Sequence, residues 1–156
     1  MKPTTPIKRV PQLKAFSHDH HHGLLLCWKI KTGMLKKIGL KQIKEYVNWF
    51  YQNYLQTHFE LEEKYIFPIL KTNNTNIQQA LKEHQRLRDL FESSSDLETN
   101  LKSIEIELEA HIRFEERILF AEIQKSATKE QLETIEKAHS KEAFIENEEA
   151  NFWSYN

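Results

Sequence analysis

The sequence predicts an all-α protein, namely an antiparallel up-down four-helix bundle with an additional C-terminal helix. Its 156 residues include only 3 Gly and 4 Pro, whereas the helix-favouring Lys, Glu and Leu are abundant. Apolar residues recur at three- to four-residue steps along most of the chain, and short polar segments interrupt this pattern. Four long segments of this kind, joined by short turns, are typical of a helical bundle because each has one apolar face to bury.

Composition and charge exclude several function classes. The chain is 29% charged with a net charge of -1, so we expect neither nucleic acid nor an anionic membrane as a partner. Cys27 is the only cysteine, which excludes a disulfide framework and argues against a thiolate zinc site. No apolar run approaches the ~20 residues of a membrane span, and the N-terminal "MKPTTPIKRVP" has no signal-peptide core. We therefore expect a cytoplasmic protein, as either a monomer or a homodimer.

The chain is predicted to have three parts. Three of the four prolines lie at positions 3, 6 and 11, so residues 1–12 are expected to form an N-terminal arm. Residues 13–125 are expected to form the bundle, and residues 126–156 a helix and tail packed on it. The terminal "NFWSYN" either packs on its own bundle, which we expect, or docks a partner protein.

The first two helices are long. The first is predicted to run through Gly33, which costs about 1 kcal/mol relative to alanine. Its buried stripe consists of Leu13, Phe16, His20, Leu24, Cys27 and Met34. The second follows the break "IGL" at 38–40 and continues to Pro68, which weakens or bends its last turn. Its stripe includes Ile43, Val47, Phe50, Tyr54, His58, Glu62 and Ile69.

Polar turns separate the remaining helices. "KTNNTN" at 71–76 supplies capping residues for the third helix, with the stripe Ile77, Leu81, His84, Leu87 and Phe91. Ser95 and Glu98 fit a capping box for the fourth helix. Its stripe consists of Leu101, Ile104, Leu108, His111, Glu115, Ile118 and Leu119. Thr128 and Gln131 fit a second capping box, which predicts a shorter and more polar fifth helix.

Two segments share the pattern His-x-x-x-Glu-Glu-basic. They are "HFELEEKYIFPIL" at 58–70 and "HIRFEERILFAEI" at 111–123. Side chains four residues apart share a helix face, so His58 projects together with Glu62. His111 projects together with Glu115 for the same reason. The second glutamate of each segment turns about 100° away and is expected in solvent or beside a base; these residues are Glu63 and Glu116.

Four histidines are predicted to lie near one level of the bundle. Their distances from the turns agree to within about 4 residues, or roughly 6 Å of helix. They are His20, His58, His84 and His111. Carboxylates can bridge two metal ions while imidazoles complete each coordination sphere, and bundle interiors hold such sites. One His-x-x-x-Glu pair alone would be an ordinary surface pair, but two at one level on apolar stripes predict a buried metal site.

The segment "HDHHHGLL" offers more than one candidate ligand on the first helix. His20 shares the apolar stripe and is the predicted ligand, whereas His21 leans about 100° away and remains the alternative. His18 and His22 are expected to support the ligands from outside or to lie at the surface. His139, in the polar fifth helix, is expected to face solvent.

This pattern resembles the hemerythrin-like, or HHE cation-binding, family over roughly residues 13–125. The resemblance rests on "HDHHHGLL", "HFELEE", "EHQRL" around His84 and "HIRFEE". It implies two iron ions in an oxo- or hydroxo-bridged di-iron centre, with other divalent metals as the alternative. It implies that Glu62 and Glu115 bridge the irons. It also implies four terminal ligands, which are His20, His58, His84 and His111.

The chain departs from the oxygen-carrying hemerythrins at two positions. Arg88 stands where those proteins have a second histidine on the third helix. Their bridging aspartate comes five residues after the fourth-helix histidine, whereas Glu115 comes four residues after His111. The chain is therefore more similar to the His-x-x-x-Glu branch, whose members are linked to iron, oxygen or nitric oxide sensing and to repair of iron centres under stress.

The resemblance implies a non-haem di-iron protein that binds, senses or reacts with O₂, NO or peroxide, in iron homeostasis or stress response. Two alternatives remain at this stage. One is an enzyme proper, either peroxidase-like or an iron donor for damaged iron centres, and the other is a metal-stabilised interaction module. No Ser-His-Asp array or phosphate-binding loop points to another reaction class, and no catalytic residue is predicted.

Overall fold

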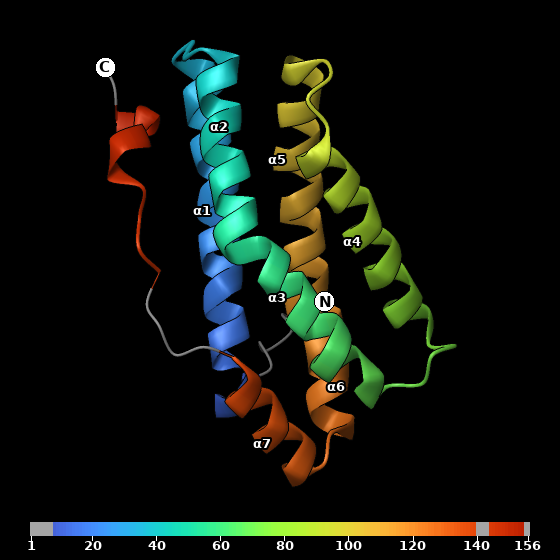
Figure 1. Cartoon of the computed structure of the whole chain (residues 1–156). Coiled ribbons are helices and arrows are strands. Elements are labelled where there is room, and N and C mark those ends of the chain that lie inside the picture. Colours follow the sequence, from blue (N-terminus) through green and yellow to red (C-terminus); the bar gives the residue numbers. More distant parts are fainter. Residues whose placement is uncertain (1–7, 140–143, 155–156) are drawn as a thin grey trace, which may run out of the picture.

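The computed structural model describes residues 8–139 and 144–154, which are mostly helical with no strand among them (Figure 1). The bundle helices are α1 (Lys14–Leu35), α2 (Leu40–Phe50), α3 (Gln56–Leu61), α4 (Thr75–Glu92), α5 (Leu97–Phe114) and α6 (Phe120–Ser126). Because α3 continues α2 and α6 continues α5, they form four rods that run alternately up and down (Figure 1). The shorter α7 (Lys129–Ala138) lies at the end where α1 begins. The predicted all-α bundle with an additional helix is therefore confirmed.

Short 3₁₀ turns complete the described chain. They are Pro11–Leu13, Phe67–Ile69, Glu148–Ala150 and Phe152–Ser154. The turn at Phe67–Ile69 contains Pro68 and ends the second rod, as the sequence predicted. The predicted N-terminal arm is described only from Lys8 onward. No described helix combines the length and the apolar content needed to cross a membrane.

Three π-helical turns lie within the rods. They are Tyr51–Leu55, Glu62–Ile66 and Glu115–Leu119. The last two begin at the first glutamate of each repeated segment, and such turns are frequent at functional sites. A π turn adds a residue to the helical turn and so changes which residues face inward after it. Ile118, predicted to be buried, is consequently 50% exposed, whereas Leu119 and Phe120 are fully buried.

The buried stripe of α4 differs from the prediction by one position. Leu81 was placed on the apolar face but is 43% exposed. The helix buries the neighbouring Ala80 instead, on the face that also carries Ile77 and His84. Because Ala80 and Leu81 are adjacent and both apolar, the sequence pattern did not distinguish between them.

The helix ends agree with the sequence at two of three positions. The Asn74 side chain accepts bonds from backbone N–H groups at the start of α4. Thr128 and Gln131 form the predicted capping box before α7. The capping box predicted at Ser95 and Glu98 is wrong. Asp96 occupies the N-cap of α5 in a left-handed conformation with φ of 46°, and its side chain makes no capping bond.

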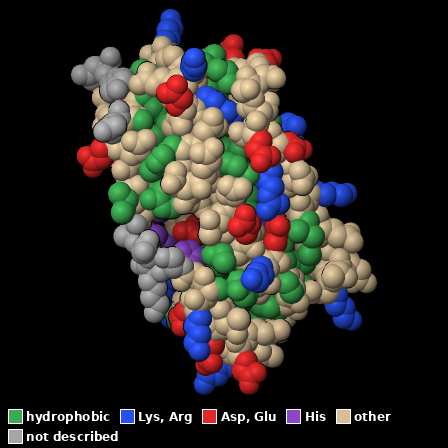
Figure 2. All heavy atoms as spheres, in the orientation of Figure 1, with side chains coloured by type: hydrophobic (Ala, Val, Ile, Leu, Met, Phe, Trp, Pro, Cys, Tyr) green, Lys and Arg blue, Asp and Glu red, His purple; other side chains and the backbone are tan. Residues whose placement is uncertain are grey.

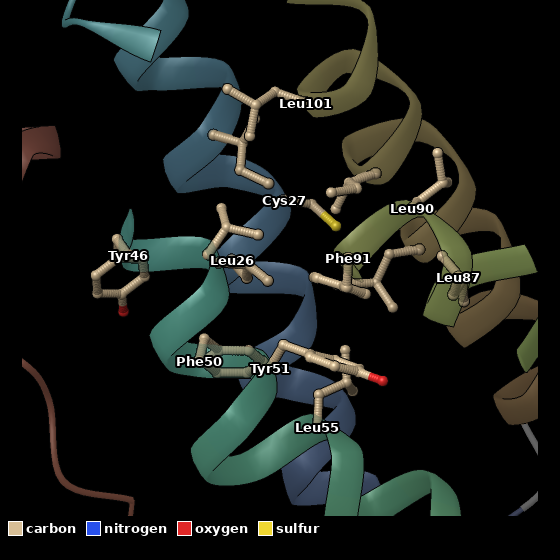
Figure 3. Close-up of a cluster of buried hydrophobic side chains, with 14 of the residues drawn as sticks. Leu26, Cys27, Tyr46, Phe50, Tyr51, Leu55, Leu87, Leu90, Phe91 and Leu101 are labelled. Carbon is tan, nitrogen blue, oxygen red and sulfur yellow. The ribbon is translucent and has the colours of Figure 1, made fainter. Parts of the chain in front are cut away.

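Two apolar clusters fill the bundle, and a polar layer separates them. The first, drawn in Figure 3, includes Leu26, Cys27, Phe50, Tyr51, Leu87 and Leu101. The second lies toward α7 and includes Leu13, Phe16, Ile66, Ile77, Leu119 and Phe120. On α1 the buried His20 falls between the two clusters, after Phe16 and before Leu26. On the other rods Glu62, His84 and Glu115 likewise fall between residues of the two clusters. His58 and His111 lie one helical turn before these glutamates and contact them.

A buried lysine, which the sequence analysis missed, fixes the turn between α4 and α5. Lys44 is 4% exposed, and its Nζ lies 2.7 Å from Asn100 Oδ1. It also donates to the carbonyl oxygens of Leu90 and Phe91, at 3.2 and 3.3 Å. These carbonyls lie in the last turn of α4, where the helix supplies no N–H four residues later. Burial lowers the pKa of Lys44 to about 8.

Gly33 lets the C-terminal segment pack closely on α1. A Cβ atom at this position would lie 2.5 Å from Cε2 of the fully buried Phe152 and 3.0 Å from Cδ1 of Ile43. We expect Gly33→Ala to lower the free energy of unfolding by about 1–3 kcal/mol, because overpacking outweighs the ~1 kcal/mol that alanine gains in a helix. Urea denaturation measures this change.

The control for Gly33→Ala is the same substitution made together with Phe152→Ala. Removing the ring relieves the two shortest contacts of the new Cβ and leaves the one with Ile43, so in this background Gly33→Ala should destabilise much less. An equal loss of stability in both backgrounds would show that the contact with Phe152 is not the cause.

Candidate metal centre

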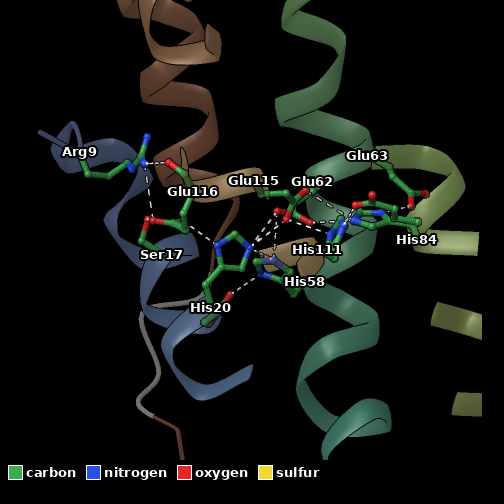
Figure 4. Close-up of polar contacts among 12 residues, drawn as sticks. Arg9, Ser17, His20, His58, Glu62, Glu63, His84, His111, Glu115 and Glu116 are labelled. Atoms are coloured by element: carbon green, nitrogen blue, oxygen red, sulfur yellow. Dashed lines mark hydrogen bonds and ion pairs between the residues drawn. The ribbon is translucent and has the colours of Figure 1, made fainter. Parts of the chain in front are cut away.

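The structure brings all six predicted site residues together in the polar layer of the bundle (Figure 4). They lie on four different rods, and each is at most 3% exposed: His20, His58, Glu62, His84, His111 and Glu115. His21, the alternative on the first helix, is exposed. The stripe that selected His20 therefore identified the histidine that faces the interior.

The six residues form two groups of four that share both glutamates. In the first group, ligand atoms of His20 and His58 join those of the glutamates. In the second group, His84 and His111 take their place. Within each group the four atoms all lie within 4.8 Å of one another. Two donor sets of this kind, which share a pair of carboxylates, could each hold a metal ion.

The inward atoms of this layer lack hydrogen-bond partners among the described residues. They include both carboxylate oxygens of Glu62 and Glu115 and Nε2 of His84 and His111. The atoms are nevertheless close together, since Nε2 of His84 lies 3.1 Å from Oε1 of Glu62. Buried polar atoms without partners are costly, and a cation among them would satisfy carboxylate and imidazole together. The residues present therefore fit a metal ion.

A carboxylate outside the layer holds each of the four histidines. The pairs, measured from Nδ1 to a carboxylate oxygen, are His20–Glu116 at 2.7 Å, His58–Asp19 at 2.9 Å, His84–Glu63 at 2.6 Å and His111–Glu83 at 2.7 Å. An Nδ1–H that donates to a carboxylate leaves the lone pair of Nε2 directed inward. Partners of this kind orient metal-binding histidines and increase their basicity.

The second glutamates of the repeated segments have two roles. As expected, each lies beside a base: Arg88 is 2.9 Å from Glu63, and Arg9 is 3.6 Å from Glu116. Each also accepts a bond from a candidate ligand histidine on another rod, which the sequence analysis did not predict. The sequence feature that could have indicated this second role is the pair of adjacent glutamates in each segment. Its first member faces the layer, and its second member holds a histidine from outside.

The expectation that His139 faces solvent is wrong. Its side chain is 14% exposed, and its Nε2 lies 2.6 Å from Oδ2 of Asp19. The same oxygen is 2.9 Å from Nδ1 of His58. Asp19 therefore connects α1, a candidate ligand and the end of α7. The position of α7 against the bundle is set by long-range packing, which the local polarity around His139 did not reveal.

Burial and charge act in opposite directions on the titration of these residues. Burial lowers the pKa of His58, but Glu62 and Asp19 outweigh it and raise this pKa to about 9. Burial and the charge of Glu115 raise the pKa of Glu62, but His58 and His20 lower it to about 2. The pKa of Glu115 is likewise lowered, against burial, mainly by His111. In the metal-free protein the imidazolium and carboxylate forms thus stabilise each other.

Metal binding at neutral pH is expected to release protons, because a metal ion needs the neutral imidazole whereas His58 is protonated below about pH 9. Calorimetric titration with Zn²⁺ in two buffers of different ionisation enthalpy measures the protons released. The apparent affinity should increase as pH rises toward 9. Heats independent of the buffer would contradict the expected protonation.

His58 also determines how the stability of the metal-free protein should depend on pH. Its folded-state pKa lies above the ordinary value of 6.5, so protonation of His58 stabilises the fold fully below about pH 6.5. This contribution is lost as pH rises through about 9. Metal should therefore stabilise the protein most at the alkaline end of this range, where the proton no longer competes.

Comparison with protein families supports the same chemistry. The model of the family described as Hemerythrin HHE cation binding domain matches residues 12–94. The chain belongs to this family. In this hemerythrin-family protein the match spans the first three rods, which carry His20, His58, Glu62 and His84. His111 and Glu115 lie beyond the matched residues, and their place in the layer rests on the structure. Comparison with curated proteins and with solved structures gives no significant match.

Proposed function

We propose that this hemerythrin-family protein holds two iron ions and that the centre binds, senses or reacts with O₂, NO or peroxide. The observation that carries the proposal is the pair of four-donor groups that share Glu62 and Glu115. Each group combines two imidazole nitrogens with carboxylate oxygens, a donor set that suits iron in bundle interiors. Thiolate does not contribute, since the single cysteine, Cys27, is outside both groups.

The residues have distinct roles in this proposal. Glu62 and Glu115 would bridge the two ions, while the four histidines would each bind one ion through Nε2. The outer carboxylates hold the imidazoles in the required tautomer. Apolar rings limit access of water: Phe59 stacks on His84 at 4.1 Å, and Phe120 stacks on His20 at 5.2 Å. Bound iron would supply ferrous–ferric redox chemistry and coordination positions that the protein does not fill.

Access to the centre favours small ligands. The six residues are almost fully buried, so a bulky substrate has no direct contact with them. One pocket of about 640 Å³ opens beside the layer, and its lining includes His58 and Asp19. A small diatomic molecule or peroxide needs far less space than this. The pocket thus supports a route for small molecules to one end of the centre.

Metal analysis of freshly purified, untagged protein is the direct test. We expect about two ions per chain, because the two donor groups share their carboxylates. Less than about one ion per chain after anaerobic ferrous loading would contradict a dinuclear centre. Zinc that is held tightly, with no response to small ligands, would instead favour a metal-stabilised interaction module.

Absorption spectra, peroxide turnover and iron transfer distinguish a small-ligand-binding centre from a peroxidase-like enzyme and from an iron donor. Anaerobically loaded ferrous protein should change its near-UV and visible absorption on exposure to O₂ or NO if the centre binds them. Peroxide turnover well above that of the same quantity of free iron would favour a peroxidase-like enzyme. Transfer of iron to an iron-depleted acceptor protein would favour the role of an iron donor. Unchanged spectra with all three small molecules would contradict the proposed function.

We also propose that residues 13–125 form the metal-binding unit and that residues 126–156 support it from outside. Two contacts support this division. His139 shares Asp19 with His58, and Phe152 packs on Gly33 of α1. The C-terminal part would then stabilise a bundle whose metal ligands all precede it.

A further inference from the structure

A pair of histidines outside the buried layer has the geometry of a second metal site. His18 and His22 lie one helical turn apart on α1, and their Nε2 atoms are 3.2 Å apart. Imidazole nitrogens bind metals such as Zn²⁺ at 2.0–2.1 Å, so two nitrogens at this separation reach one ion at an angle of about 100°. Histidines at positions i and i+4 of a helix are a recurrent chelating arrangement.

The surroundings of the pair hold this geometry. The ring of His22 stacks on Phe144, with centroids 4.3 Å apart and planes at 23°. The ring of His18 meets that of His22 nearly at right angles, at 4.8 Å. The intervening His21 is farther from both, at 6.3 and 5.6 Å between centroids. The two rings of the pair are thus arranged together, while His21 is separate.

The pair is accessible and faces the pocket that reaches the buried layer. His18 is exposed and His22 is partly buried. Both line the pocket of about 640 Å³, whose lining also includes Asp19 and His58. Figure 2 shows histidine side chains at the molecular surface on the face that is drawn. An ion bound by the pair would therefore lie in the same pocket as an outer edge of the candidate centre.

We propose that His18 and His22 bind a divalent transition-metal ion in this pocket and act as a receiving site for the buried centre. Imidazole donors select Zn²⁺, Cu²⁺, Ni²⁺ or Fe²⁺ over Mg²⁺ and Ca²⁺. Two protein ligands hold an ion less tightly than the four of each buried group, so the ion can move on. Binding by the pair stands on its own geometry, whereas the receiving role rests on the proposed function.

The first experiment follows the histidine rings by NMR while Zn²⁺ is added to the full chain. The rings of His18 and His22 should shift, and His18→Ala should weaken the response of His22 by about tenfold or more. His21→Ala is the matched control, since it removes an exposed imidazole from the same helix turn but should leave both responses intact. Unshifted rings in excess Zn²⁺ would overturn the site.

The second experiment measures the rate at which limiting Fe²⁺ enters the buried centre under anaerobic conditions. His18→Ala and His22→Ala should slow uptake several-fold without changing the final iron content, and His21→Ala should behave as wild type. An unchanged rate would overturn the receiving role. A wild-type protein that takes up no iron contradicts the proposed function and the receiving role together, whereas the Zn²⁺ response of the two rings still decides the pair itself.

Discussion

Replacing Glu62 and Glu115 together with glutamine should remove the dinuclear centre. Both side chains are fully buried, and each belongs to both groups of ligand atoms. Glutamine has nearly the same shape, but it carries no charge and offers only one oxygen. We expect the metal content to fall from about two ions per chain to less than about one, and the affinity to fall by at least about 100-fold. Metal analysis and competition with a chelating dye measure these losses.

The matched control for this variant is Glu60→Gln together with Glu109→Gln. It makes the same change in charge on the same two rods, but both side chains are exposed. Metal content should then remain that of the wild type. Circular dichroism of both double variants checks that the helices are intact. Full metal content in a correctly folded Glu62→Gln, Glu115→Gln protein would contradict the bridging role.

Removing an outer carboxylate should weaken metal binding without removing a ligand. Glu83 is the simplest case, because its Oε1 lies 2.7 Å from Nδ1 of His111 and its Oε2 accepts a bond from Gln79 at the surface. Glu83→Ala leaves the imidazole free to rotate and lowers its basicity, so we expect affinity to fall by about 10–100-fold. Glu83→Gln should have a smaller effect because its amide oxygen can still accept the bond. Metal competition titrations measure both.

Glu107→Ala provides the comparison for Glu83→Ala. This carboxylate is similarly accessible, with 36% of its side chain exposed against 32% for Glu83, but it pairs with Arg86 at the surface. It lies one turn before His111 and does not hold it. Equal metal affinity in the two alanine variants would show that the outer carboxylate does not tune the centre. An unchanged number of bound metal ions in Glu83→Ala, together with a weaker affinity, would support the proposed role of Glu83 in orienting His111.

The candidate site could be predicted from the sequence because pairs of metal-binding side chains recur at helical spacing. His58 with Glu62 and His111 with Glu115 share a helix face because they are four residues apart, and this holds in any helix that contains them. Counting residues from the turns was sufficient to bring the four histidines to one level, since the rise per residue is constant. These two properties are local, and they predicted the bundle and the six residues that the structure places together.

Properties that depend on the neighbouring rod were not predicted. The phase change at the π turns exposes Ile118 although the apolar pattern places it inside. Whether Glu63 meets His84 depends on how the second rod and α4 approach each other, whereas helical spacing indicated only that Glu63 points away from the layer. The burial of Lys44 follows from the end of α4 lying beside α2, where the lysine finds carbonyl groups to bond.

Residue spacing alone predicted the helical class and most of the inward-facing residues, including the six candidate ligands, because spacing along one helix decides which side chains share a face. The contacts behind those residues depend on the tertiary structure: a carboxylate at each of the four candidate ligand histidines, His139 on Asp19, and the pocket that His18 and His22 share with His58. The reason is physical. A contact between rods depends on their relative rotation and distance, which are set by the packing of the whole core rather than by any local segment.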